Sequence, residues 1–133
     1  MIRGAVPAAL VLVACIHWLP AVGVLGGERL LMLYDVAADE VNLALLLRHR
    51  AVLFGVLGAL LLAGAFVRAL QWPALIAGLV SVGSFLLLAA AADSPNAAIQ
   101  RVVVVDRWAL VTLLAAMVVK VVVYRGGTPH LQL

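Results

Sequence analysis

The sequence predicts an all-α fold: an integral membrane, antiparallel four-helix up-down bundle with a short interfacial helix after the first span. Of the 133 residues, 67% are hydrophobic and 11% are charged, and the mean hydropathy is +1.23. A soluble domain is roughly 45–50% apolar and about 25% charged. The apolar residues also gather in runs long enough to cross a hydrocarbon core of about 30 Å. Short connections between the runs favour antiparallel neighbours within a single domain, residues 1–133.

The first span covers about residues 4–26, which contain no Asp, Glu, Lys or Arg. Pro20 has no N–H, so it should interrupt the helix and leave the carbonyl of Ile16 without its usual donor. A basic start before an apolar run is also typical of a cleaved signal peptide. Residues 12–15 resemble a bacterial lipobox, which would make Cys15 a lipidated N-terminus. The residues after Cys15 remain apolar, which favours a retained span.

The longest connection contains elements of its own. Residues 28–34 predict a short helix lying in the membrane interface, with Tyr34 at the level of the head groups. A break follows at 35–39, where we expect Asp39 to cap a new helix and Glu40 to lie in its first turn. This helix should run on into the second span, about residues 51–67.

The third span covers about residues 72–92, and Trp72 and Pro73 at its start suit a helix that begins at an interface. Asp93, Ser94, Pro95 and Asn96 predict a turn. The fourth span covers about residues 99–124. Small residues in the second and third spans favour close helix packing and permit a homodimer. These are Gly55, Gly58, Ala59, Ala63, Gly64, Ala74, Ala77, Gly78 and Ser81.

Orientation follows from the distribution of basic residues, which is nearly even between the two sides. The side of the termini carries Arg3, Arg68, Lys120 and Arg125 and no acids. The basic residues of the other side are interleaved with carboxylates, which suits a role in the protein's own structure. We therefore expect cytoplasmic termini and a multi-pass protein in contact with membrane lipids.

Polar residues collect at one mouth of the predicted bundle, because the end of the first span and the starts of the second and fourth meet there. We interpret them as a ligand-binding or structural polar cluster. The members are Glu28, Arg29, Arg48, His49, Arg50, Gln100, Arg101, Asp106 and Arg107. Arginine suits the anionic groups of lipid heads, because its planar fork matches phosphate and carboxylate.

Asp106 lies about two turns into the fourth span. A carboxylate facing lipid there would cost about 2.5–3.5 kcal/mol, so it should face inward. We expect it to pair with Arg48 or Arg50. It then serves as a structural ion pair, or it lines a pocket for a lipid head group or small solute.

His17, near the middle of the first span, is the other intramembrane polar candidate. It is either functional or bonded to a backbone carbonyl, Ser81 or Ser84. No metal or cofactor is predicted: a zinc site lacks ligands at matching depth, and a haem would need a second axial ligand there. There is no catalytic motif, so an enzyme is not the favoured interpretation. No basic cluster with interleaved aromatics is present, which argues against nucleic-acid binding.

Residues 26–34 and 47–55 resemble a group of small proteobacterial membrane proteins, DoxX-like in layout, and the resemblance continues through 77–82 and 101–106. It implies a four-helix fold in a bacterial inner (plasma) membrane and, through the DoxX-like proteins, a link to respiratory quinones. Some members carry the label phosphopantetheine adenylyltransferase. This chain lacks the H-x-G-H signature of that soluble enzyme, so its sequence does not support the label.

Together these features predict that the polar mouth of the bundle binds a lipid, an isoprenoid or quinone-type molecule, or a protein partner. Two alternatives remain open. The first is a small-solute or proton-coupled transporter, for which Asp106 is the candidate carboxylate. The second is a membrane enzyme acting on lipid or quinone, in which Asp106, His49 or His17 would titrate during turnover.

Overall fold

The structure, a computed structural model, describes residues 4–36 and 40–126, and these residues form helices and connections without any strand. The α-helices are α1 (Ala5–Ala21), α2 (Gly27–Tyr34), α3 (Val41–Phe66), α4 (Gln71–Ala91) and α5 (Ala97–Gly126). Short 3₁₀ turns, Val22–Leu25 and Arg68–Leu70, follow α1 and precede α4. The predicted all-α fold class is confirmed.

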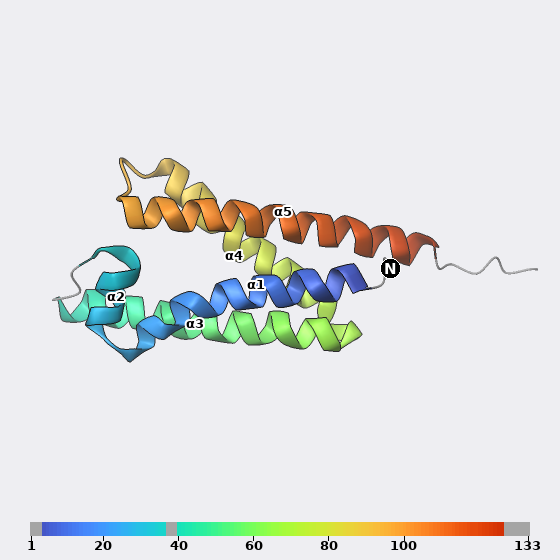
Figure 1. Ribbon diagram of the computed structural model, residues 1–133, viewed down its shortest axis with the longest axis horizontal. Coiled ribbons are helices and arrows are strands. Elements are labelled where there is room, and N and C mark those ends of the chain that lie inside the picture. Colours follow the sequence, from blue (N-terminus) through green and yellow to red (C-terminus); the bar gives the residue numbers. More distant parts are fainter. Residues whose placement is uncertain (1–3, 37–39, 127–133) are drawn as a thin grey trace, which may run out of the picture.

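The four long helices alternate in direction, and the short α2 lies at the end of the bundle where α3 and α5 begin (Figure 1). Each long helix packs mainly on two neighbours, in the cyclic order α1, α3, α4, α5. Helices α3 and α5 are therefore diagonal partners across the interior. This is the predicted antiparallel up-down bundle, and it places the start of α1 and the end of α5 at the same end of the molecule (Figure 1).

Within residues 4–36 and 40–126, four segments are long and apolar enough to cross a membrane: Ala5–Leu25, Val41–Phe66, Arg68–Ala91 and Ala97–Val122. Only 17% to 28% of an 18-residue apolar window in each segment is buried inside the bundle, and many large apolar side chains of these helices are exposed. Water disfavours such a surface, whereas lipid accepts it. Length, composition and outward-facing apolar side chains are thus those of a small membrane protein.

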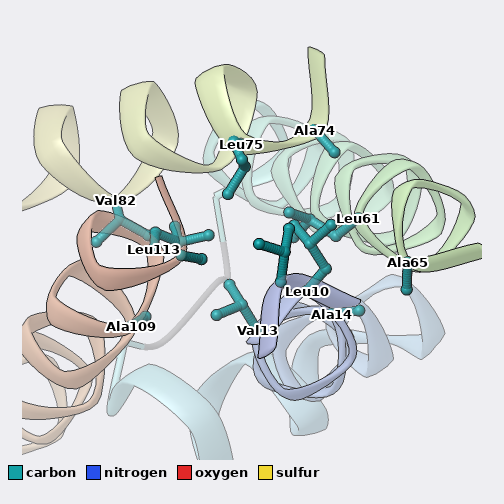
Figure 2. Close-up of a cluster of buried hydrophobic side chains, with 12 residues drawn as sticks. Leu10, Val13, Ala14, Leu61, Ala65, Ala74, Leu75, Val82, Ala109 and Leu113 are labelled. Carbon is teal, nitrogen blue, oxygen red and sulfur yellow. The ribbon is translucent and has the colours of Figure 1, made fainter. Parts of the chain in front are cut away.

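The hydrophobic core fills the half of the bundle that lies away from α2. Leu10, Leu61, Leu75 and Leu113, one from each long helix, are fully buried and meet in this half (Figure 2). Small residues allow the helices to approach, as predicted. A Cβ atom placed on Gly64 would lie 2.7 Å from the Cβ of Ala74, so α3 and α4 pack with almost no space between their backbones here.

The interruption predicted at Pro20 is present, because α1 ends one residue later and the chain continues as the 3₁₀ turn. Gly26 then joins this turn to α2 with φ +148°, a backbone conformation open to glycine and strained for other residues. Before the interruption, the indole Nε1–H of Trp18 donates to the carbonyl of Gly55 at 3.3 Å. This bond ties α1 to α3.

Helix α3 runs unbroken from Val41 through Arg50 into the second span, as expected. The predicted cap is wrong: Glu40, and not Asp39, is the N-cap residue. Its carboxylate accepts from the backbone N–H groups of Asn42 and Leu43 at 2.9 and 2.7 Å. The longer Glu side chain reaches the free N–H groups from this position. Asp39 itself lies outside the described residues.

Asn96 connects the start of α5 to the end of α2. Its Oδ1 accepts from the backbone N–H of Ile99 at 2.8 Å, which caps α5. Its Nδ2 donates to the carbonyl of Tyr34 at 2.9 Å. One side chain in the predicted turn thus fixes the position of α2 over the bundle end.

Candidate functional site

A cavity of about 200 Å³ lies between α1, α2, α3 and α5 at the α2 end, beyond the hydrophobic core. Its walls are mostly apolar, with five polar or charged side chains among them. The polar members are His17, Tyr34, Arg50, Arg101 and Asp106. The apolar members are Ile16, Leu19, Pro20, Leu33, Phe54, Ala98, Val102 and Val105. An apolar cavity with a few convergent polar groups is the usual form of a small-molecule site.

The guanidinium of Arg50 is the centre of this arrangement. Its carbon lies 5.6 Å from the ring centroid of Tyr34, 5.1 Å from that of Phe54 and 5.4 Å from that of Phe85. Cation–π attraction to rings from α2, α3 and α4 holds the side chain inside the bundle. Of the residues Arg48, His49 and Arg50, only the last turns inward, because successive helical side chains rotate by about 100°.

His17, on α1, is almost fully buried and lines the cavity. Its Nδ1 lies 2.9 Å from the carbonyl of Val13, an acceptor, so Nδ1 carries the proton and the neutral ring keeps a lone pair on Nε2. Of the interpretations made from sequence, the structure shows the backbone hydrogen bond, and Ser84 donates to the carbonyl of Ser81 instead. The ring also packs against Phe54, with centroids 5.7 Å apart.

Tyr34 closes the cavity from the side of α2. We expected Tyr34 at the level of the head groups; its side chain is only 5% exposed and turns toward Arg50. Attraction to the guanidinium of Arg50, and the hydrogen bond that Asn96 donates to the Tyr34 carbonyl, hold Tyr34 in this position. Burial raises the pKa of the Tyr34 phenol, partly offset by the nearby charge of Arg50, so the hydroxyl keeps its proton and can donate.

Asp106 lines the same cavity from α5 and is half-buried. The positive charge of Arg50 attracts this carboxylate. Within the described residues, however, Asp106 has no hydrogen bond or direct ion pair, so the expected contact with Arg48 or Arg50 is not formed. The guanidinium packs on the three aromatic rings, and both charged side chains line the same cavity.

The remaining predicted residues lie outside this cavity, apart from Arg101 at its exposed rim. Glu28, Arg29, Arg48 and His49 are exposed on α2 and α3. Gln100 donates to the carbonyl of Pro95 at 3.1 Å, and with Arg107 it borders a separate groove between α4 and α5. The predicted polar cluster thus divides into residues that line the cavity and residues that lie outside it.

A second cavity, of about 420 Å³, lies between α3 and α4. Arg50 and Phe54 line both cavities, so these two side chains form the partition between them. The other walls of the second cavity are apolar except for two serines. They are Leu53, Leu57, Ser81, Ser84, Phe85 and Leu88.

At the opposite end of the bundle, Lys120 donates to the side-chain oxygen of Gln71. This contact holds the ammonium group of Lys120 against the start of α4. In the part of the chain that the structure describes, no three His, Cys, Asp or Glu side chains come together as metal ligands would.

Sequence reasoning missed three members of the site: Tyr34, Phe54 and Phe85. A signal existed, because the chain has only eight aromatic residues and one of them, Phe54, follows Arg50 by one helical turn. The contribution of Phe85 comes from α4, and no spacing along the chain connects it to Arg50.

Comparison of the chain with known protein families, with characterised proteins and with solved structures gives no match.

Proposed function

We propose that this protein binds an amphipathic molecule of the membrane, of lipid or isoprenoid/quinone type, with its polar group in the cavity between α1, α2, α3 and α5. The observation that carries the proposal is the convergence of polar atoms from four separate helices on one otherwise apolar cavity. Leaving polar groups unpartnered in an apolar setting is unfavourable, and a ligand removes that penalty. A concave site of this size suits a small molecule better than a protein partner.

The position of the cavity along the bundle supports this choice. From Arg50 to Phe66, α3 is about 24 Å long at a rise of about 1.5 Å per residue. If Phe66 marks one boundary of a hydrocarbon core of about 30 Å, Arg50 lies just inside the other. Along α5, Asp106 lies about 21 Å from Lys120. If Lys120 lies at the same boundary as Phe66, Asp106 is slightly deeper in the hydrocarbon core than Arg50. A ligand there has its head at the interface and its chain in lipid.

We also place the protein in a bacterial inner membrane with cytoplasmic termini, on the strength of the basic residues at the terminal side and the DoxX-like resemblance. In that orientation the cavity faces the opposite, non-cytoplasmic boundary. Arg68, Lys120 and Arg125 lie at the terminal side without acidic neighbours in sequence.

Native mass spectrometry of the full chain, released from its own membrane, tests the binding function. Wild type is compared with Asp106→Asn, which keeps the side-chain shape and removes the charge, and with Asp93→Asn, the same change at an exposed turn outside the cavity. We expect a discrete bound mass in wild type and Asp93→Asn that is reduced about tenfold in Asp106→Asn. Bare protein in all three samples would refute the proposal.

Proton-coupled transport is a second candidate, favoured by one observation: Asp106 is a carboxylate in a spanning helix with no hydrogen-bond partner among the described residues. Such a group can exchange a proton between states. In proteoliposomes under a pH gradient, a transporter would move protons in wild type and lose this flux in Asp106→Asn, with Asp93→Asn unaffected. Equal leakage from all three would exclude this candidate.

A further inference from the structure

The polar atoms of the cavity also indicate which head group fits. Resting on the proposed function, we infer that the ligand carries an uncharged, hydroxyl-bearing head group, and that its apolar chain leaves the cavity sideways between α1 and α5. The inference depends on three features of the site: its hydrogen-bonding capacities, its balance of charge and the position of its opening.

The cavity offers both acceptors and donors. His17 presents only the lone pair of Nε2, because its Nδ1–H is used by Val13. The carboxylate of Asp106 accepts only, the guanidinium of Arg50 donates only, and the hydroxyl of Tyr34 does both. Among the described residues, these four groups form no hydrogen bond through the atoms just named. Every fully buried polar side-chain atom of the described residues has a hydrogen-bond partner, so atoms without a partner are not fully buried. The atoms are therefore open to the cavity.

A ligand complementary to these groups must donate as well as accept. A hydroxyl does both with a single oxygen. An ester or ether oxygen only accepts, and it would leave His17 and Asp106 unpartnered. A neutral head group bearing one or more hydroxyls satisfies both sides of the cavity.

The charges favour the same class. Arg50 and Asp106 are opposite charges on the diagonal helices α3 and α5, and both line the cavity. A phosphate or carboxylate attracted to Arg50 would also approach the carboxylate of Asp106, and an ammonium group would meet the guanidinium. Like charges in a weakly solvated site repel strongly. Arg101 is exposed at the rim and remains available to ordinary lipid heads.

The opening lies between α1 and α5. Leu19 and Val105, one on each helix, line the cavity while 65% and 40% exposed, so the wall here is incomplete. Helices α1 and α5 lie close together near the start of α1 and diverge toward α2 (Figure 1). Pro20, which ends the regular helix at this level, lines the same side. An apolar chain passing between Leu19 and Val105 reaches the outer, lipid-facing surface directly.

Three probes with the same chain separate the possible head groups: monooleoylglycerol, which is neutral and has hydroxyls; oleate, which is anionic; and methyl oleate, which only accepts. Binding of each to the full-length, delipidated protein is measured by native mass spectrometry titration. We expect monooleoylglycerol to bind one-to-one with a Kd at least about tenfold lower than the other two. Equal or tighter binding of oleate or methyl oleate would overturn the inference.

Tyr34→Phe removes one hydroxyl from the cavity and keeps the ring that faces Arg50. It should weaken monooleoylglycerol binding about fivefold, the effect of one hydrogen bond. Thr112→Val is the matched control, since that hydroxyl bonds within its own helix to the carbonyl of Trp108, outside the cavity. If oleate binds more tightly than monooleoylglycerol and Tyr34→Phe weakens that binding, the neutral head group is refuted and the proposed cavity stands. If no probe binds, or if Tyr34→Phe leaves binding unchanged, both the neutral head group and the proposed cavity are refuted.

Discussion

Single side chains in this protein connect segments that the apolar surfaces alone would not hold in place. Arg50 does so through three aromatic rings, Asn96 by capping α5 and binding the end of α2, and Trp18 by bonding the backbone of α3. In lipid the hydrophobic effect does not drive helices together, so specific contacts of this kind determine which faces meet.

Replacing Trp18 with Phe should destabilise the bundle by about 1 kcal/mol, because it leaves the carbonyl of Gly55 without its donor from α1. A thermal melt in detergent measures the difference. Trp108→Phe is the control, since Trp108 is an exposed residue of α5 whose side chain has no hydrogen-bond partner among the described residues. Equal melting of the two variants would show that the indole bond contributes nothing.

The Glu40 cap should make the start of α3 sensitive to pH. Its hydrogen bonds to the backbone N–H groups of Asn42 and Leu43 lower the pKa of the carboxyl below its ordinary value of 4.5. A group whose pKa is lower in the folded state stabilises above its unfolded pKa, and this stabilisation is lost as pH falls through the folded pKa. The protection of the Asn42 and Leu43 amides from exchange, relative to their intrinsic exchange rates at each pH, should therefore fall below about pH 4.5.

Glu40→Gln should show faster exchange at neutral pH and little further change on acidification. Glu28→Gln, in the first turn of α2, is the matched control and should leave these two amides unchanged. If the wild type and Glu40→Gln exchange alike at neutral pH, the charged cap is not what holds the start of α3.

At the scale of elements, close helix packing and the cavity occupy opposite halves of the bundle. Small residues bring α3 and α4 together at Gly64 and Ala74, and the core leucines fill the space beside them. Toward α2 the helices separate, and aromatic and charged side chains line the interior. These small residues are used within one chain, so a homodimer, which stays a prediction, would need a different face.

Gly64→Ala should destabilise the bundle by about 1–3 kcal/mol, because the new Cβ would lie 2.7 Å from that of Ala74 and 3.2 Å from the carbonyl of Leu70. Neither atom can move without its backbone. Gly83→Ala in α4 is the control: nothing lies within 4 Å of its Cβ position. There the gain in helix propensity should stabilise by up to about 1 kcal/mol. Similar melting temperatures for the two variants would contradict the close approach.

For the whole molecule, the alternation of helix direction predicts which connections share a side of the membrane. The test starts from a Cys15→Ala protein, which removes the only cysteine. Single Glu28→Cys and Ser94→Cys variants should then react with an impermeant maleimide from the same side, and Ala69→Cys from the other. Labelling of Glu28→Cys and Ser94→Cys from opposite sides would rule out four crossings.

The sequence by itself determined the number of spans, the position of the 93–96 turn, the short helix predicted at 28–34 and the interruption at Pro20. Each depends on local properties: the length of an apolar run, the missing N–H of proline, or the turn preference of Asp, Ser, Pro and Asn. The tertiary structure alone decided that Arg50 lies inside while Arg48 and His49 stay exposed, that Tyr34 faces the bundle, and that Phe85 joins the site. The reason is physical. Lipid and protein interior are both apolar, so hydrophobicity along these helices does not distinguish their inward faces from their outward ones.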